Sequence, residues 1–82
     1  MSDMKLQSEL KAIIAKIIEI DDFNDDDNFA TELGVDSMLA LEIVARIEKR
    51  YRIRIPEEQF AQLQTLSETT RIVAEIRQPV KS

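Results

Sequence analysis

Hydrophobic residues recur at helical spacing near the start of the chain. Between residues 3 and 20 they follow one another every three or four positions, while lysines and glutamates fill most positions between them. This period matches one face of an α-helix. The apolar positions are Leu6, Leu10, Ile13, Ile14, Ile17 and Ile18. The pattern predicts an amphipathic helix over residues 3–20, capped near Ser2 or Asp3.

The helical pattern is lost over residues 21–28, where aspartate and asparagine dominate. Their short polar side chains compete for backbone hydrogen bonds and so favour loops. We therefore expect a long loop that is anchored in the core by Phe23, Phe29 and Leu33.

The acidic loop is a poor match to a calcium-binding EF-hand. Counted from Asp22, the position that requires glycine holds Asp27, and the position that requires a bidentate glutamate holds Leu33. Counted from Asp21, Phe23 occupies a ligand position. We expect a solvated acidic loop and no metal site.

A second amphipathic segment follows, and its apolar residues again recur every three or four positions. Asp36 or Ser37 can cap the first N–H groups, and the basic residues near Tyr51 suit a helix C-terminus. The apolar stripe comprises Met38, Leu41, Val44, Ile47 and Tyr51. The pattern predicts a strongly amphipathic helix from about residue 37 to residue 51. Met4 and Met38 are expected to pack in the core, as methionines in apolar stripes usually do.

Two further helices are predicted in the rest of the chain. A proline fits the first turn of a short helix over residues 56–63. Thr65 and Glu68 then form a capping-box pattern, which predicts a last helix that runs to about Arg77 and is stopped by Pro79.

Composition supports a helical fold. The 82 residues include only one glycine and two prolines, and aromatic residues make up 5%. Domains rich in strands need more turns and more aromatic and β-branched residues. We expect an all-α four-helix bundle with three longer helices and a short third one. It forms a single domain over residues 3–78, followed by a flexible tail over residues 79–82.

Missing residue types exclude several kinds of chemistry. The chain contains no cysteine, histidine or tryptophan. Cysteine and histidine are the usual zinc ligands and the usual nucleophile and base of hydrolases. Disulfides, ordinary zinc sites and Ser-His or Cys-His catalysis are therefore excluded. The clustered aspartates lie in a polar loop, so tuned acid-base catalysis is not expected. We expect a binding or carrier module that is not an enzyme.

The formal net charge of −5 narrows the partners and the location. An acidic surface repels the phosphates of nucleic acid, so no nucleic-acid partner is expected. No apolar run approaches the roughly 20 residues of a bilayer-crossing helix, and the N-terminus lacks the order of a signal peptide. We expect a cytoplasmic monomer. The acidity is uneven, because residues 1–36 carry −7 and residues 37–82 carry +2.

Ser37 is the candidate functional residue, because it places a hydroxyl at the start of a helix. An Asp-Ser pair at such a place is most often only an N-cap. The chain offers Ser37 no base that would make it a nucleophile in its own right. It is better suited to be modified by another enzyme. A phosphodiester on Ser37 would meet free N–H groups and the positive end of the helix dipole.

Residues 28–38, NFATELGVDSM, resemble the phosphopantetheine attachment motif of acyl carrier proteins. In that motif a Phe is followed by Leu-Gly-x-Asp-Ser and then Leu or Met. The similarity continues through the second predicted helix, Ile55-Pro56, Phe60 and Thr65, and covers about residues 4–77. The resemblance implies a stand-alone carrier of the same four-helix fold.

By this resemblance, a phosphopantetheinyl transferase moves 4′-phosphopantetheine from coenzyme A onto Ser37. The thiol of the arm then holds acyl groups as thioesters and presents them to enzymes such as a ketosynthase or an acyl ligase. Asp36 and Met38 are implied to flank the attachment point. Val35 is implied as a further apolar contact for partners.

The resemblance also implies a cleft for a short acyl chain, lined by Leu41, Ile55 and Phe60. The same apolar residues are equally consistent with simple core packing.

One departure from the family pattern bears on the partners. Fatty-acid carriers have a strongly acidic second helix with an aspartate commonly two residues after the serine, where this chain has Leu39. Glu42 remains, but Arg46 and Lys49 interrupt the acidic face. Charge complementarity tunes partner choice, so these residues favour a carrier for polyketide or other specialised acyl chemistry over one for fatty acids.

Two alternatives stay open on sequence grounds. An aminoacyl carrier is one: D-alanyl carriers also use Asp-Ser-Met, whereas the Gly-Gly-His/Asp-Ser motif of peptidyl carriers matches poorly. The other is an unmodified helical adaptor in which Ser37 is only a cap.

Overall fold

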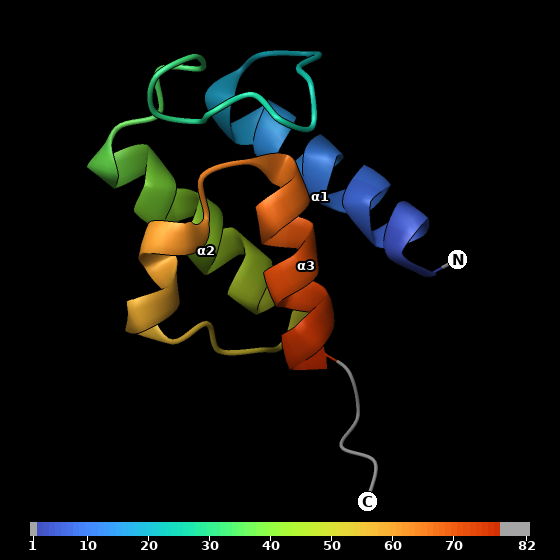
Figure 1. Cartoon of the computed structure of the whole chain (residues 1–82). Helices are drawn as coiled ribbons and strands as arrows, with labels where there is room; N and C mark the ends of the chain where they lie inside the picture. The colour runs from blue at the N-terminus through green and yellow to red at the C-terminus, as the bar shows by residue number, and fades with distance from the viewer. Residues whose placement is uncertain (1, 78–82) are drawn as a thin grey trace, which may run out of the picture.

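A computed structural model describes residues 2–77 of the chain (Figure 1). Within this range it contains α1 (Ser2–Ile18), α2 (Ser37–Tyr51), the short 3-10 helix η1 (Glu57–Gln62) and α3 (Leu66–Arg77). The predicted all-α fold of three longer helices and one short helix is confirmed. The predicted stop at Pro79, the tail over residues 79–82 and the cap side chains near residue 2 lie outside what is described.

The three longer helices share one hydrophobic core. α1 contacts both α2 and α3, and α1 and α3 lie side by side in Figure 1. Burying one large aliphatic side chain stabilises a fold by about 1.5–3 kcal/mol. The buried positions are Leu6, Leu10 and Ile14 of α1, Ile43, Val44 and Ile47 of α2, and Leu66, Ile72 and Val73 of α3.

α1 ends two residues earlier than its apolar pattern predicts. Glu19 adopts the left-handed conformation, with φ of 62°, and thereby stops the helix after Ile18. The N–H of Ile20 then donates to the carbonyl of Ala15 at 3.2 Å, which closes the last turn. Ile20 still packs against the core from outside the helix.

The long loop between α1 and α2 is held against the core by buried side chains and by a backbone hydrogen bond. Phe23 and Phe29 are buried, and their rings meet edge to face with centroids 6.3 Å apart. The N–H of Phe29 donates to the carbonyl of Gln64 at 2.8 Å. Leu33 is half-buried against the core. The three predicted anchors are confirmed, and they hold the loop beside the start of α3.

Gly34 gives the loop a turn that other residues adopt with strain. Its φ is +70°, in the left-handed region, and a Cβ built on it would meet no atom within 4 Å. The conformation of the backbone, and not lack of space, therefore calls for glycine.

The short third helix differs from the prediction in type and in its first residue. It is a 3-10 helix, in which the N–H of Gln59 donates to the carbonyl of Pro56 at 2.9 Å. Pro56 itself is extended and precedes the helix. Of the two bonds of the predicted capping box, the structure shows the one in which the Thr65 hydroxyl accepts from the N–H of Glu68, at 3.1 Å.

The prediction that Met4 and Met38 pack in the core is wrong. Each side chain is 79% exposed, and Leu41 is 56% exposed. Met38 precedes Ile47 by nine residues, or two and a half helical turns, and so lies on the opposite side of α2. The buried stripe of α2 follows its Ile and Val residues and leaves Met38 in solvent.

Candidate functional site

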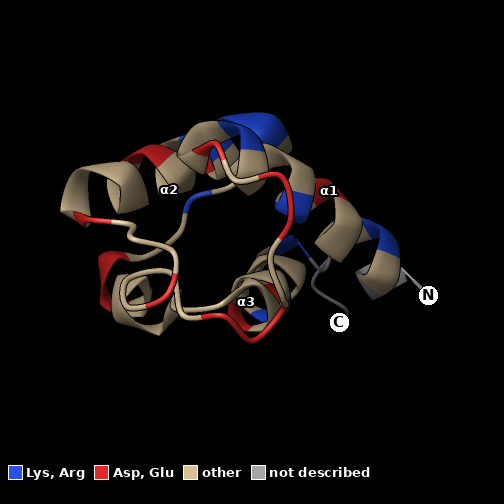
Figure 2. Ribbon diagram, turned by 90° about the horizontal axis from the view of Figure 1, so that it is seen from above, with Lys and Arg blue, Asp and Glu red and all other residues tan. Residues whose placement is uncertain are grey.

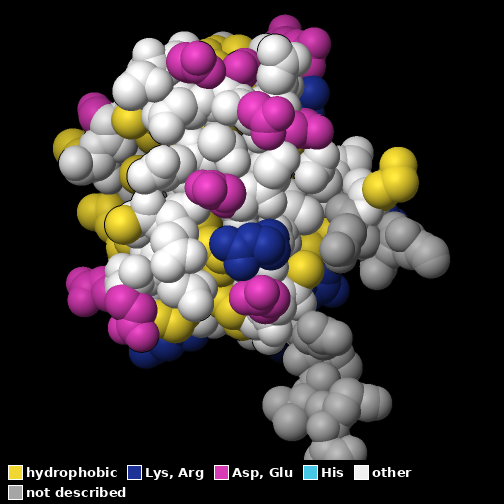
Figure 3. Space-filling model, in the orientation of Figure 1, with side chains coloured by type: hydrophobic (Ala, Val, Ile, Leu, Met, Phe, Trp, Pro, Cys, Tyr) yellow, Lys and Arg dark blue, Asp and Glu magenta, His cyan; other side chains and the backbone are white. Residues whose placement is uncertain are grey.

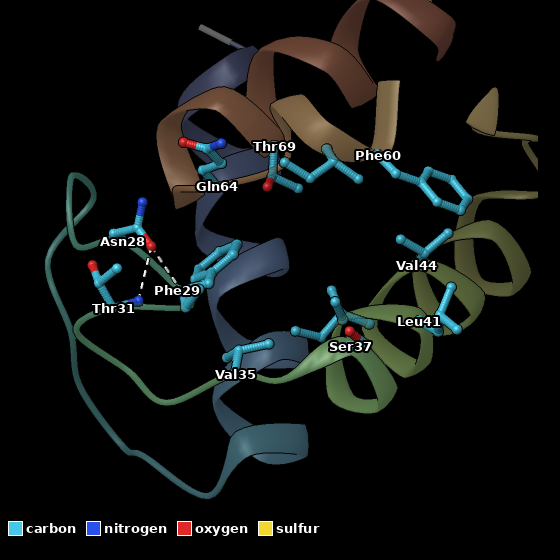
Figure 4. A pocket seen from close by; sticks show the side chains of 14 residues that line it. Asn28, Phe29, Thr31, Val35, Ser37, Leu41, Val44, Phe60, Gln64 and Thr69 are labelled. Atoms are coloured by element: carbon cyan, nitrogen blue, oxygen red, sulfur yellow. Dashed lines mark hydrogen bonds between the residues drawn. The ribbon is translucent and has the colours of Figure 1, made fainter. Parts of the chain in front are cut away.

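The first turn of α2 presents Ser37 to solvent (Figure 4). Asp36 precedes the helix in an extended conformation, and its Oδ1 accepts from the N–H of Leu39 at 2.9 Å. This bond identifies Asp36, not Ser37, as the N-cap. The Ser37 hydroxyl makes no hydrogen bond to another residue among those described, so it is free to react.

Backbone N–H groups at the start of α2 remain available to an anion. The N–H of Ala40 donates to the carbonyl of Asp36 at 2.9 Å, and Leu39 is taken by the cap. The N–H groups of Ser37 and Met38 have no such partner in the described part of the chain. Because the helix dipole is positive at this end, a phosphate on Ser37 would be stabilised there.

The loop before α2 is held by a small set of hydrogen bonds around Asn28. Its Oδ1 accepts from the N–H groups of Ala30 and Thr31 at 2.9 and 3.0 Å (Figure 4). Its own N–H donates to Glu32 Oε1 at 3.0 Å. The N–H of Val35 donates to the carbonyl of Phe29 at 2.8 Å. These bonds fix the approach of the chain to Ser37.

A pocket of about 530 Å³ opens beside Ser37, between the loop, α2, η1 and the start of α3. Its size is typical of pockets that hold small organic molecules. Most of its lining is apolar. Figure 4 shows Leu41, Val44 and Phe60 at one side of the pocket and Asn28, Thr31 and Gln64 at the other. Ser37 itself belongs to the lining.

The pocket agrees only in part with the predicted acyl cleft. Leu41 and Phe60 line it as predicted, but Ile55 does not. Ile55 is 3% exposed and packs in the core, where its N–H donates to Glu48 Oε2 at 2.8 Å. Hydrophobic side chains gather along the edge of the molecule where α2 begins and η1 lies (Figure 3).

The remaining predicted contact residues fall into two groups. Val35 is buried and Leu39 is half-buried against the core, so both support the site from within. Glu42, Arg46 and Lys49 are exposed on α2. The structure thus leaves the charged residues, together with Met38, as the surface that a partner can touch.

The polar side of the pocket was missed from the sequence. Asn28, Thr31, Gln64 and Thr69 line it, and they come from the loop and from the start of α3. One local signal was present, because an asparagine side chain in a loop often accepts a hydrogen bond from the backbone two residues on, as Asn28 does from Ala30. Nothing local links that turn to Gln64.

Among the described residues no helix is both long and apolar enough to cross a membrane. No group of acidic side chains in that range is arranged to hold a metal ion.

Comparison with known proteins identifies the family of the chain. The model of the phosphopantetheine attachment site family matches residues 8–73. The acyl carrier protein of Streptomyces coelicolor is 34% identical over 76 residues, which are 89% of this chain and 83% of that protein. The polyketide-8 synthase acyl carrier protein 2 of Streptomyces avermitilis is 34% identical over 65 residues, 77% of this chain and 75% of its relative. The anthracycline acyl carrier protein DauA of Streptomyces sp. (strain C5) is 36% identical over 69 residues, which are 79% of this chain and 81% of that protein.

The helical bundle, the exposed serine and the apolar pocket at the start of α2 therefore agree with these matches, and the protein is a carrier. The chain belongs to the acyl carrier protein family. Its members bear phosphopantetheine and are carriers, not enzymes, and the predicted cofactor is confirmed. The alternative of an unmodified adaptor is overturned by this match. A carrier of this family implies a phosphopantetheinyl transferase and the enzymes of a synthase as partners.

Proposed function

We propose that Ser37 is the residue that carries 4′-phosphopantetheine, transferred from coenzyme A. The matched range contains three serines, at positions 8, 37 and 67. Ser8 lies within α1, and the N–H of Ser67 is tied to the loop by a 3.1 Å bond to the carbonyl of Asp25. Ser37 alone of the three borders the pocket. The observation that carries the proposal is this exposed hydroxyl, beside free N–H groups and an apolar pocket.

The test is a mass measurement after incubation with coenzyme A and a phosphopantetheinyl transferase of broad specificity. The protein should gain the mass of one phosphopantetheine. The Ser37→Ala variant should gain nothing, while Ser8→Ala and Ser67→Ala should gain as much as the unchanged protein. Loading of Ser37→Ala would overturn the assignment.

When bound, phosphopantetheine supplies a thiol that the chain itself lacks, since the sequence has no cysteine. The residues of the chain hold and present the cargo. Asp36 fixes the first turn, Met38 offers an exposed apolar contact beside the serine, and the pocket offers apolar walls to a short acyl group. With no histidine anywhere in the sequence, the chain lacks the base that usually activates a serine or cysteine for thioester cleavage.

We propose a cargo from polyketide or other specialised acyl synthesis. Two of the relatives are named for polyketide and anthracycline synthesis, which supports an acyl cargo over an amino acid. The exposed face of α2 also mixes Glu42 with Arg46 and Lys49, so it is not the uniformly acidic face of fatty-acid carriers. The proposed partners are the transferase and acyl enzymes such as a ketosynthase or an acyl ligase, which meet a monomeric carrier in the cytoplasm.

The cargo is tested directly by isolating the loaded protein from its native cells and releasing the thioester for mass spectrometry. A ketide or other modified acyl group supports the proposal. A straight saturated chain would assign the protein to fatty-acid synthesis, and an aminoacyl group would assign it to the aminoacyl carriers.

A further inference from the structure

Five cations are concentrated in the last turns of α2 and in the connector that follows. We call this set the basic stripe; it comprises Arg46, Lys49, Arg50, Arg52 and Arg54, and all five are exposed. Within residues 46–54 the only carboxylate is Glu48, so the segment carries a net charge of +4. The rest of the chain then carries −9. Figure 2 shows acidic positions along the loop that joins α1 to α2.

The basic stripe makes no ion pair within the described part of the molecule, and its one aromatic contact there is that of the Arg50 guanidinium, 5.8 Å from the centre of the Tyr51 ring. The ion pairs there are Lys11 with Asp22 and Arg71 with Glu75, and neither involves the stripe. Glu48 is occupied, since its Oε2 accepts from the N–H of Ile55 at 2.8 Å. The fold therefore leaves all five cations exposed, and none of them is paired with a carboxylate among the described residues.

Local helix electrostatics explain only part of the stripe. Cations in the last turn complement the helix dipole, which accounts for Lys49 and Arg50. Arg46 lies before that turn, and Arg54 lies beyond the helix.

Arg52 stands out in the stripe because of its backbone conformation. It holds the left-handed conformation, with φ of 57° and ψ of 48°, at the C-terminal end of α2. Glycine is the usual residue at such a position because its backbone adopts this conformation without a Cβ penalty. The chain keeps a charged side chain where glycine would be more stable.

We propose that the basic stripe is a docking surface for an acidic patch on a partner protein. Four of the five cations are arginines, whose planar guanidinium groups bind carboxylates in a bidentate manner. The inference rests on the proposed carrier function, because it names the kind of surface that a partner of the carrier uses.

The charge of the rest of the molecule favours a protein over an extended polyanion. A membrane surface or an RNA would extend past the stripe and meet the remaining −9 of the chain. A partner protein can present carboxylates over the small area of the stripe alone. Its complementarity would act mainly on the rate of encounter and on the choice of partner.

The stripe is placed to guide a partner toward the serine. Arg46 and Arg52 follow Ser37 by 9 and 15 residues in the sequence, or about 14 and 22 Å along a helix axis. Met38 and Glu42 lie on the same side of α2 as Lys49, at helical spacing. A partner bound at the stripe therefore has a continuous exposed face that leads to Ser37.

The experiment places a photoreactive amino acid at Ala45, an exposed position of α2 next to Arg46. The full chain is crosslinked in its native cells, and the adduct is identified together with the partner residues that it joins. The same probe at Met38 serves as the positive control, and the probe at Lys16, exposed on α1, serves as the background.

Two variants with equal net charge separate the stripe from general electrostatics. Arg46→Glu with Lys49→Glu reverses two charges of the stripe, and Lys5→Glu with Lys16→Glu reverses two exposed charges of α1. We expect the Ala45 adduct to fall about tenfold in the first variant and to change little in the second. Arg52→Gly should also lower the adduct while leaving the melting temperature unchanged or higher, which separates docking from folding.

The proposal is supported by a protein adduct at position 45 whose joined surface has an excess of Asp and Glu. It is overturned by an adduct with RNA or lipid, by a neutral or basic protein surface, or by an adduct that survives the stripe reversal. An absent adduct at position 45, when position 38 is crosslinked, overturns it as well. Loading of each variant with phosphopantetheine is measured in parallel, so a failure of the carrier assignment is recognised separately.

Discussion

The two ends of α2 are built in opposite ways. At its start, Asp36 caps the helix, and Ser37 and Met38 are left in solvent beside the pocket. At its other end, the Tyr51 hydroxyl donates to Glu9 Oε1 of α1 at 2.9 Å, and the guanidinium of Arg77 lies 4.8 Å from the centre of the Tyr51 ring. One end meets solvent, and the other end joins all three longer helices.

This difference explains how a bundle of 82 residues can carry a large modification. The groups that hold α1, α2 and α3 together are placed at the Tyr51 end and in the core between the helices. The Ser37 end contributes few bonds beyond its cap. If phosphopantetheine is attached at Ser37 as proposed, we expect its attachment to leave the packing of the helices intact.

The largest expected effect is the loss of core packing in the second half of α2. Ile47 is fully buried, and Ile47→Ala should lower the free energy of unfolding by about 2–5 kcal/mol, because it removes buried methyl groups and leaves a cavity. Urea unfolding followed by circular dichroism measures the loss.

Leu41→Ala is the matched comparison at the pocket end of α2. Leu41 is 56% exposed, so truncating it should cost less than about 1 kcal/mol. Equal losses for the two variants would contradict the division of α2 into an open end and a packed end.

The next effect concerns the cap. Asp36→Ala should cost about 1 kcal/mol, because the N–H of Leu39 loses its acceptor. Asp36→Asn should cost little, since asparagine caps as well as aspartate. Ser37→Ala should be nearly neutral in thermal unfolding. A loss for Ser37→Ala as large as that for Asp36→Ala would make Ser37 the cap and would contradict the open hydroxyl.

The start of α2 could be predicted because the decisive contacts are local. The cap joins Asp36 to Leu39, three residues away, and the glycine turn lies directly before it. Contacts between residues so close in the sequence can be predicted from the local residue types alone. The family motif carried the same information at the same positions.

The exposure of Met38 and Leu41 could not be read from the pattern, because an apolar stripe on a helix can be wider than the surface that covers it. Hydrophobic residues on the flank of a stripe are common at protein surfaces. The 3-10 form of η1 was also hidden, because the α and 3-10 forms differ by only one residue in their hydrogen-bond register.

The contacts at the Tyr51 end of α2 could not be predicted from the sequence, for a different reason. Tyr51 and Glu9 are 42 residues apart, and Arg77 comes from a third helix. Each residue alone fits an ordinary helix surface. Only the packing of the helices brings the three together, so the most constrained part of the bundle was the least predictable from one sequence.

Removing the Tyr51 hydroxyl is expected to have a smaller effect than removing the cap. Tyr51→Phe should cost about 0.5–1 kcal/mol, because the half-buried bond to Glu9 is lost. A double-mutant cycle with Glu9→Gln should show that the two changes are not additive. Additive losses would mean that the pair contributes nothing to holding α1 against α2.

The smallest expected effect is the dependence of stability on alkaline pH. Burial, and then the hydrogen bond to Glu9, raise the pKa of Tyr51 above its ordinary value. The folded protein therefore holds the phenol proton more tightly than the unfolded chain does. The resulting stabilisation is fully present below the ordinary pKa of about 10 and is lost as pH rises through the higher folded pKa. Because Tyr51 is only half-buried, solvent screening limits the effect to a few tenths of a kcal/mol.

The absorbance of tyrosinate reports this titration without ambiguity, since the chain contains one tyrosine and no tryptophan. The midpoint in the folded protein should lie above that of the protein in urea. Glu9→Gln should lower the folded midpoint only in part, because burial is the larger cause of the raised pKa. If the midpoints of the folded and unfolded protein coincide, Tyr51 is in free exchange with solvent, and this end of α2 is as open as the end that presents Ser37.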